Sequence, residues 1–206
     1  MGCASDSRAQ VAERIVREDT THVAQMLQVS RGASPLVCEM TARTVDQRGY
    51  WSMWGPISGD PLVTDSASAD VLTWVQRRHN DPALVPRLRA AMRDGDGCVR
   101  RVAASLLARV HHASATAALV QALDDASAGT REVAAFGLGM TQHEPAIDPL
   151  IARLRDASAP VRRAAAWALG QLEARKAEAP LLELLTRDPD PRVRQTAAWA
   201  VGSIRQ

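Results

Sequence analysis

The sequence predicts an all-α solenoid, in which pairs of short helices stack along the chain. One short pattern occurs four times and begins at Val99, Thr130, Val161 and Val193, with offsets of 31, 31 and 32 residues. Each copy has the apolar spacing of a helix that buries one face. A second apolar helix pattern precedes each copy. A fixed period in this range is typical of a solenoid.

Each copy is interpreted as the second helix of a repeat. In the third copy, apolar or small residues fall on one helical face, at Val161, Ala164, Ala165, Ala168, Leu169 and Leu172. Three copies carry glycine at their tenth position, as Gly139, Gly170 and Gly202. Glycine weakens a helix interior by about 1 kcal/mol relative to alanine. The recurrence of glycine at the tenth position of the helix therefore predicts a close contact between helices there.

The helix before each copy also has an apolar face, for example Leu150, Ile151 and Leu154. Pro149 and Pro180 fit the first turn of such helices, where a missing N–H costs little. Between the two helices, residues 156–159 and 188–191 supply capping and turn residues. Each repeat is therefore predicted as helix, short turn, helix.

Two parts precede the regular repeats. Residues 1–46 carry helix patterns over 7–18, from Thr20 or Thr21, and from Ser34, and we interpret them as a degenerate repeat that caps the solenoid. Residues 47–66 form a loop insertion by their Gly and Pro content. The insertion contains the aromatic residues Tyr50, Trp51 and Trp54. It is either a docking loop or a cover for the apolar edge of the terminal repeats. The solenoid is assigned to residues 67–206, beginning with a helix over 67–79.

The pattern Asp-x-x-x-x-Val-Arg-x-x-Ala-Ala-x-Ala-Leu-Gly resembles the HEAT-like repeat of the phycobilisome-lyase type. The residues that carry it best are Asp156, Val161, Arg162, Ala165, Ala166, Leu169 and Gly170. The resemblance covers about residues 82–206. It implies a right-handed solenoid whose second helices line the concave surface. It implies little about activity, because such repeats mostly serve as scaffolds.

An aromatic series occupies the seventh position of the repeated helix. It comprises Phe136, Trp167 and Trp199, whereas the first copy has Ser105. The resemblance places these rings in the concave groove, with Arg163 positioned to stack on Trp167. The rings are either anchors for a partner or peptide or an internal ladder that packs neighbouring repeats.

Arginine recurs at the second position of the helix, and aspartate recurs just upstream. The arginines are Arg100, Arg131, Arg162 and Arg194, and the aspartates are Asp94, Asp125, Asp156 and Asp188. A phosphate-binding stripe would use such arginines, but we favour an Asp–Arg ladder that ties each turn to the next repeat. Acidic residues nearly balance basic ones, at 23 against 25, so a nucleic-acid partner is not expected.

Cysteine usage predicts neither a disulfide nor a thiolate metal site. Cys3, Cys38 and Cys98 are widely separated, odd in number and form no Cys-x-x-Cys motif. A reducing, cytoplasmic location is therefore the default. The alternative is a periplasmic lipoprotein, if Met-Gly-Cys is what remains of a leader truncated before Cys3. No apolar run reaches the roughly 20 residues that span a membrane.

No metal, cofactor or catalytic residue is expected. Members of this repeat family that oxidise a modified lysine carry several His-Glu pairs and bind two irons. This sequence has one such pair, His143-Glu144, and the resemblance does not carry a di-iron site over. His111 and His112 are interpreted as solvated histidines. No Gly-rich phosphate loop or nucleophile motif is present.

The sequence therefore favours a non-catalytic scaffold for protein–protein interaction. The partner or peptide would bind on the concave surface formed by the repeated helices. The candidate partner-binding residues are Phe136, Trp167, Trp199, Arg163, Tyr50, Trp51 and Trp54. The alternative is a partner-dependent lyase or oxidoreductase subunit of the same repeat family. The sequence does not predict an oligomeric state.

Overall fold

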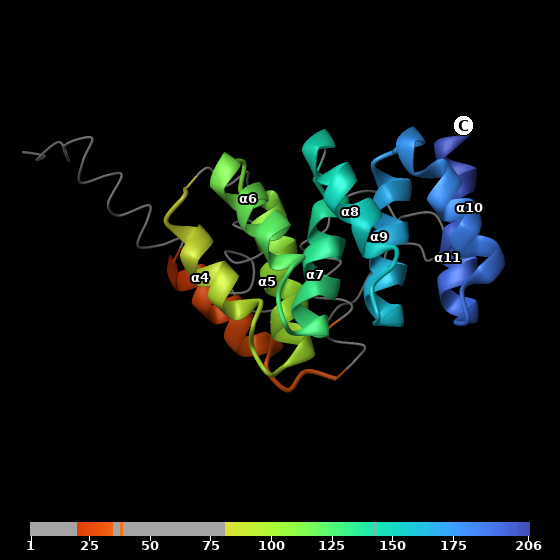
Figure 1. Ribbon diagram of the computed structural model, residues 1–206. Coiled ribbons are helices and arrows are strands. Elements are labelled where there is room, and N and C mark those ends of the chain that lie inside the picture. The colour runs from red at the N-terminus through yellow and green to blue at the C-terminus, as the bar shows by residue number, and fades with distance from the viewer. Residues whose placement is uncertain (1–19, 35–37, 39–80, 142) are drawn as a thin grey trace, which may run out of the picture.

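The computed structural model describes residues 20–34, 38, 81–141 and 143–206, and these residues form helices without any β-strand (Figure 1). A helix over residues 20–30 confirms the one expected from Thr20 or Thr21. The later helices are α4 (Leu84–Ala91), α5 (Gly97–Arg109), α6 (Ala113–Ala122), α7 (Ala128–Gly139), α8 (Ile147–Arg153), α9 (Ala159–Gln171), α10 (Glu178–Arg187) and α11 (Pro191–Ile204). The expected helices over 7–18 and 67–79 and the insertion at 47–66 lie outside the described residues.

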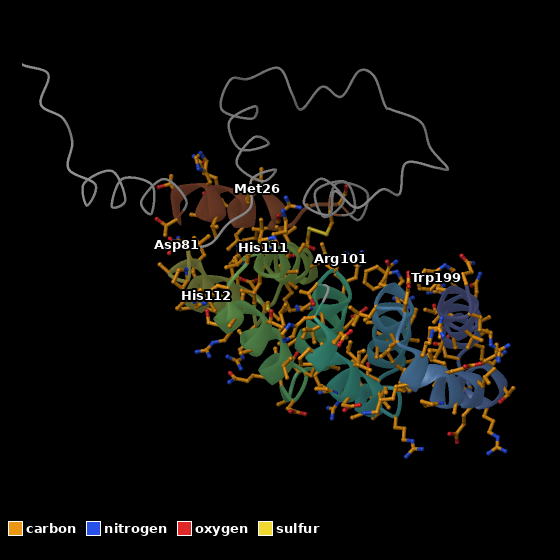
Figure 2. All side chains as sticks on the ribbon, turned by 90° about the horizontal axis from the view of Figure 1, so that it is seen from above. Met26, Asp81, Arg101, His111, His112 and Trp199 are labelled. Carbon is orange, nitrogen blue, oxygen red and sulfur yellow. A yellow bond between two sulfur atoms is a disulfide. The ribbon has the colours of Figure 1, made fainter. Side chains whose placement is uncertain are left out.

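The helices after residue 81 form repeated pairs. The first helix of each pair, called helix A, is α4, α6, α8 or α10, and the second, called helix B, is α5, α7, α9 or α11. Short 3₁₀ helices, η2 (Glu144–Ala146) and η3 (Arg175–Ala177), lead into α8 and α10. Figure 2 shows the A helices and the B helices as two rows. Consecutive B helices pack directly on one another, which confirms the solenoid.

Polar residues in the A–B turns start the B helices. Asp96 accepts hydrogen bonds from the backbone N–H groups of Cys98 and Val99 at the start of α5. Ser127 does the same for Thr130 in α7, and Asp190 for Arg192 in α11. These bonds satisfy N–H groups that have no partner inside the helix.

Small residues on the B helices allow close packing. Paired alanines in α5, α7 and α9 are fully buried: Ala103, Ala104, Ala134, Ala135, Ala165 and Ala166. The A helices contribute larger side chains, and Leu119, Leu150 and Leu181 have no exposed surface. Burying a leucine stabilises a fold by about 1.5–3 kcal/mol. The core is therefore a continuous layer between the two rows of helices.

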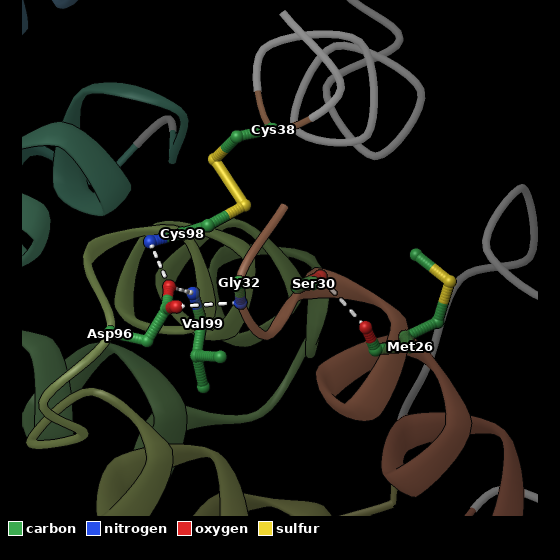
Figure 3. Close-up of a disulfide and its surroundings, with 7 residues drawn as sticks. All are labelled: Met26, Ser30, Gly32, Cys38, Asp96, Cys98 and Val99. Atoms are coloured by element: carbon green, nitrogen blue, oxygen red, sulfur yellow. Dashed lines mark hydrogen bonds between the residues drawn. A yellow bond between two sulfur atoms is a disulfide. The ribbon is translucent and has the colours of Figure 1, made fainter. Parts of the chain in front are cut away.

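A disulfide joins the N-terminal segment to the first repeat, and the expectation that the cysteines form none is wrong. Cys38 is bonded to Cys98 at the start of α5, with their Cα atoms 5.5 Å apart across 60 residues of sequence (Figure 3). Wide spacing misled the sequence argument, because only the fold brings these residues within bonding distance. Gly32 N–H also donates to Asp96 at 2.8 Å, so the helix over 20–30 is held against α5 beside the disulfide.

None of the helices in the described ranges is both long and apolar enough to cross a lipid bilayer.

Candidate binding groove on the B helices

A groove of about 380 Å³ lies on the B-helix surface. Its walls come from α5, α7, α9 and α11, and its lining residues are Gly97, Arg100, Arg101, Glu132, Val133, Phe136, Arg163, Ala164, Trp167 and Thr196. Figure 2 shows Arg101 and Trp199 on the side of the B helices that faces away from the A helices. The groove therefore combines aromatic rings with several guanidinium groups.

Two aromatic rings stack along the groove. The Phe136 and Trp167 rings have centroids 4.8 Å apart and planes inclined by 15°. The Arg101 guanidinium carbon lies 4.3 Å from the centroid of Phe136 and extends this stack by a cation–π contact. Arg163, the residue expected to stack on Trp167, has Nη2 3.7 Å from Oε1 of Glu132. Sequence reasoning missed Arg101, although its position three residues into the first copy could have identified it.

Two of the recurring glycines lie beneath tryptophan rings of the next B helix. A Cβ atom on Gly139 would lie 2.8 Å from Cζ3 of Trp167 and 2.7 Å from Cα of Ala168. A Cβ atom on Gly170 would lie 2.6 Å from Cζ3 of Trp199. The close helix contact expected from the glycines is therefore confirmed at Gly139 and Gly170. It is wrong for Gly202, where a Cβ atom would meet nothing within 4 Å. The tryptophans pack one repeat on the next, and Trp167 also lines the groove.

An Asp–Arg ladder crosses the A–B turns, as the sequence indicated. Arg162 donates from Nε and Nη2 to both carboxylate oxygens of Asp188 in the next turn, at 2.7 and 2.9 Å. Its Nη1 donates to two backbone carbonyls in its own turn, at 2.9 and 3.2 Å. Arg131 makes the same bidentate contact with Asp156. Each arginine therefore joins its own turn to the next repeat.

Asp156 and Asp188 each accept hydrogen bonds from two neighbouring repeats. Besides binding arginine, Asp188 accepts the N–H of Asp190 at 2.9 Å, and Asp156 accepts that of Ser158 at 2.9 Å. The hydrogen bond from Arg162 is the main reason that the pKa of Asp188 lies below its ordinary value. Arg131 lowers the pKa of Asp156 in the same way. Both carboxylates are therefore held ionised in the folded protein.

The ladder changes at the first repeat. Arg100 reaches the carbonyls of its own turn, Asp94 O and Gly95 O, at 2.8 and 2.9 Å. Asp125, which the expected ladder assigns to Arg100, instead binds Arg93 at 2.7 Å. The Arg100 side chain lies against Gly129, where a Cβ atom would be 2.9 Å from its Nη2. The expectation of a uniform ladder is therefore wrong for Arg100.

The histidines have structural or solvent-exposed positions. His111, His112 and His143 are exposed. His112 precedes α6, and its Nδ1 accepts the backbone N–H of Ser114 at 3.2 Å, so it caps that helix. Across the part of the chain that the structure describes, no three His, Cys, Asp or Glu side chains are grouped as metal ligands.

Of the remaining candidate residues, the structure describes only Trp199. Trp199 lies at the last B helix with 38% of its surface exposed, next to the end of the groove rather than in its lining. Tyr50, Trp51 and Trp54 lie outside the described residues. Ser105, which replaces the ring in the first copy, is fully buried. The aromatic series therefore begins at Phe136.

A second groove, of about 710 Å³, lies on the opposite face between α8 and α10. Ile151, Ala152 and Pro180 form part of its apolar floor, and Arg155 and Glu183 stand at its margin. The described A helices therefore diverge here, whereas α9 and α11 pack closely.

Comparison with protein families identifies the repeat. A family model described as HEAT repeats matches residues 82–166 and 147–206, which is more than half of the chain. The chain belongs to the HEAT-repeat family. This match spans the same region as the resemblance seen in the sequence. No curated protein sequence matches the chain.

Several solved structures align with this chain. Human deoxyhypusine hydroxylase, in complex with glycerol, aligns with a TM-score of 0.50 and 23% identity, covering 92% of this chain and 74% of that one. The complex of CpcE and CpcF of phycocyanin lyase from Nostoc sp. PCC7120 aligns with a TM-score of 0.49 and 25% identity, covering 68% of this chain and 60% of that one. An engineered protein aligns with a TM-score of 0.48 and 19% identity, covering 97% and 85% of the two chains. At 23% identity, the likeness to the hydroxylase concerns the fold alone.

Proposed function

We propose that this HEAT-repeat protein is a non-catalytic scaffold that binds a segment of a partner protein in the B-helix groove. The observation that carries the proposal is the groove itself, with Phe136 and Trp167 stacked along it and Arg101 and Arg163 beside them. Aromatic and arginine side chains are the residue types that most often dominate binding energy at protein interfaces.

The polar groups of the groove support binding rather than catalysis. They are three guanidinium groups, the Glu132 carboxylate and the Thr196 hydroxyl, and Glu132 already lies near Arg163. Guanidinium groups remain protonated in proteins and donate hydrogen bonds in a fixed geometry. They suit recognition of carboxylates and backbone carbonyls. This composition favours the scaffold over a lyase or oxidoreductase subunit.

The test uses charge reversal instead of removal of the rings. Trp167 covers Gly139, so its loss would disturb packing as well as binding. Peptides from a displayed random library would be selected on the wild-type protein and measured by calorimetry. We expect Arg163→Glu to weaken the selected peptides about tenfold or more. Arg155→Glu is the matched control, because Arg155 is exposed on the opposite face.

The melting temperature of each variant completes this test. We expect both variants to melt close to the wild type, because Arg155 and Arg163 each make a single long ion pair, at 3.8 and 3.7 Å. Equal affinity of the selected peptides for wild type and Arg163→Glu would contradict the groove as the binding site. Peptides that lose affinity only in Arg155→Glu would move the site to the groove between α8 and α10.

We also propose that the protein works in an oxidising compartment, in place of the cytoplasmic default drawn from sequence. The Cys38–Cys98 disulfide supports this, because disulfides persist mainly in oxidising environments. A periplasmic location satisfies this condition. Alkylation of free thiols in intact host cells, followed by mass spectrometry, tests it. Both cysteines should resist alkylation until a reductant is added, and labelling of both without reductant would contradict the proposal.

A further inference from the structure

Arg100 has the same position in its helix as Arg131 and Arg162, but its side chain is used differently. In Arg131 and Arg162, Nε and Nη2 bind both carboxylate oxygens of an aspartate in the next turn. The aspartate that would complete this contact for Arg100 is Asp125, and it binds Arg93 instead. Nε of Arg100 is buried and has no hydrogen-bond acceptor within the described parts of the chain. The carboxylate-binding edge of Arg100 is therefore left without a carboxylate from its own ladder.

Two glycines leave room for the Arg100 guanidinium at the wall of the B-helix groove. A Cβ atom on Gly129 would lie 2.9, 3.0 and 3.1 Å from its Nη2, Nε and Cζ, so the guanidinium lies flat over this glycine. A Cβ atom on Gly97 would lie 3.4 Å from the same Nη2, and both Gly97 and Arg100 line the groove. In the next two repeats, Pro160 and Arg192 occupy the position of Gly129. The first repeat therefore places in the groove an arginine that later repeats use to join their turns.

The side chains that line the groove carry an excess of positive charge. Arg100, Arg101 and Arg163 line it, against the single carboxylate of Glu132. Glu132 lies 3.7 Å from Arg163 and balances that arginine, whereas Arg101 lies over the ring of Phe136. A guanidinium remains protonated and forms strong charge-assisted hydrogen bonds with carboxylates. Arg100 is therefore the lining residue best placed to bind a carboxylate that enters the groove.

We propose that the partner segment in the B-helix groove carries an acidic side chain, whose carboxylate accepts a hydrogen bond from Nη2 of Arg100. This inference rests on the proposed function and adds the chemistry of the segment. An apolar side chain of the same segment would lie beside the stacked rings of Phe136 and Trp167. Because packed helices lie about 8–10 Å apart and an extended chain advances about 3.3 Å per residue, the acidic and apolar residues would be about four positions apart.

The groove suits an acidic protein segment better than a nucleic acid. The Glu132 carboxylate in its lining would repel a phosphodiester backbone, which carries a negative charge on every nucleotide. A peptide can place one acidic side chain at Arg100 and uncharged residues beside Glu132. The walls come from α5, α7, α9 and α11 themselves, so a repeat added at either end of the array would stack beside the groove without filling it.

A double-mutant cycle tests the contact between Arg100 and the acidic side chain. Peptides selected from the random library on the full wild-type chain should share an aspartate or glutamate about four positions from an apolar residue. Each peptide is synthesised with an amidated C-terminus, once with its acidic residue and once with the matching amide. We expect the amide peptide and Arg100→Gln each to weaken binding about tenfold in calorimetry. The two changes together should weaken it no further, because they remove the same contact.

Arg194→Gln is the matched control for Arg100→Gln. Nη1 of Arg194 donates to two carbonyls of its own turn, at 2.7 and 3.2 Å, as Nη1 of Arg100 does at 2.8 and 2.9 Å. Arg194 stands outside the lining of the groove. Both variants should therefore lower the melting temperature by a similar amount, and only Arg100→Gln should weaken the peptides. Equal losses of affinity in the two variants would overturn the proposed contact.

The remaining outcomes separate this inference from the proposed function. Selected peptides that lack a shared acidic residue, or that bind Arg100→Gln as tightly as the wild type, would overturn the inference alone if Arg163→Glu still weakens them. Peptides that are indifferent to Arg163→Glu would overturn the proposed function and this inference together. A labelled single-stranded oligonucleotide that binds more tightly than the peptides and needs Arg100, or a dimer of this chain that dissociates in Arg100→Gln, would also overturn the acidic segment as the occupant.

Discussion

The two ends of the described repeat array differ in how far other residues cover them. At the N-terminal end, residues 20–34 lie against α5, where Arg31 binds Asp94 through both carboxylate oxygens and Cys38 is bonded to Cys98. At the C-terminal end, Trp199 is partly exposed and Gly202 faces open space. The same kinds of groups are covered at one end and uncovered at the other.

This difference shows what a HEAT repeat does and does not specify. From α7 onward, each B helix packs on the next at a joint formed by an arginine and a glycine of one repeat and an aspartate and a ring of the next. Whether an end is covered depends on residues that do not belong to the repeat, such as Arg31 and Cys38. Stability in such arrays is approximately a sum of repeat and interface contributions. Equivalent groups can therefore be removed from a joint and from an end. The difference between the two losses of stability measures how much the joint contributes.

The largest expected difference is between Arg162 and Arg194. Arg162→Ala leaves Asp188, whose side chain is 2% exposed, without its partner in the joint. Breaking such a buried pair typically costs about 3–5 kcal/mol. Arg194→Ala removes only hydrogen bonds to carbonyls in its own turn, worth about 1–2 kcal/mol. Urea unfolding followed by tryptophan fluorescence measures both.

A double substitution provides the control for this difference. Arg162→Ala with Asp188→Asn removes the unpaired charge, so it should be less destabilising than the sum of the two single changes. Additive effects would show that the two side chains do not interact. Equal losses for Arg162→Ala and Arg194→Ala would remove the distinction between joint and end.

The disulfide makes the second largest contribution, and it acts at the covered end alone. Replacing Cys38 and Cys98 by serine opens a loop of 60 residues, and loss of a disulfide typically costs about 2–4 kcal/mol. Thermal unfolding with and without reductant measures the effect in the wild type. Reductant should leave the double variant unchanged. A reductant-insensitive wild type would show that the disulfide does not form in solution.

The glycines provide a matched pair with opposite expected signs. A Cβ atom on Gly170 would lie 2.6 Å from the Trp199 ring and 2.9 Å from Ala200 Cα, so Gly170→Ala should cost about 1–3 kcal/mol. Gly202→Ala meets no neighbour and should stabilise the helix by up to about 1 kcal/mol. Thermal melts compare the two variants directly. A stabilising Gly170→Ala would contradict the close approach of α9 and α11.

Acid should weaken the joints and the covered end together. The pKa values of Asp156 and Asp188 are lowered by their arginines, and Arg31 lowers that of Asp94. A carboxyl with a lowered pKa stabilises the fold above its unfolded pKa, near 3.8, and this stability is lost as the pH falls through the folded pKa. The urea midpoint should therefore drop below about pH 4. Arg162→Ala should flatten that drop, whereas Arg194→Ala should flatten it less, because the charge of Arg194 is the smallest of the causes that lower the pKa of Asp188.

Most of the fold could be predicted from the sequence because the features of the repeat depend on residues that are close together in the chain. The period, the helical spacing, the turn aspartates and the glycines at the tenth position each depend on residues close together in the chain. Gly139 and Gly170 were expected to mark close contacts, and they do. The ladder through Arg131 and Arg162 was also expected, because arginine and aspartate recur with the same period.

The features that the sequence did not predict depend on contacts between distant residues. Cys38 and Cys98 are 60 residues apart, and their pairing follows from how residues 20–34 lie against α5. Arg93 replaces Arg100 at Asp125 because of its position at the end of helix A, which no periodic pattern records. Arg101, not Arg163, lies over an aromatic ring, because stacking depends on side-chain direction across neighbouring helices. Local patterns do not determine such choices.

Covering one end and leaving the other uncovered gives the solenoid a mechanical direction. Pulled from its two ends, the described array should yield first at α11, whose contacts among the described helices are with α9 and α10, and then release helix pairs in order toward α5. The cystine would arrest extension of the 60 residues that it encloses, so the contour length released by force should stop short of the full chain. In the reduced protein that missing length would reappear.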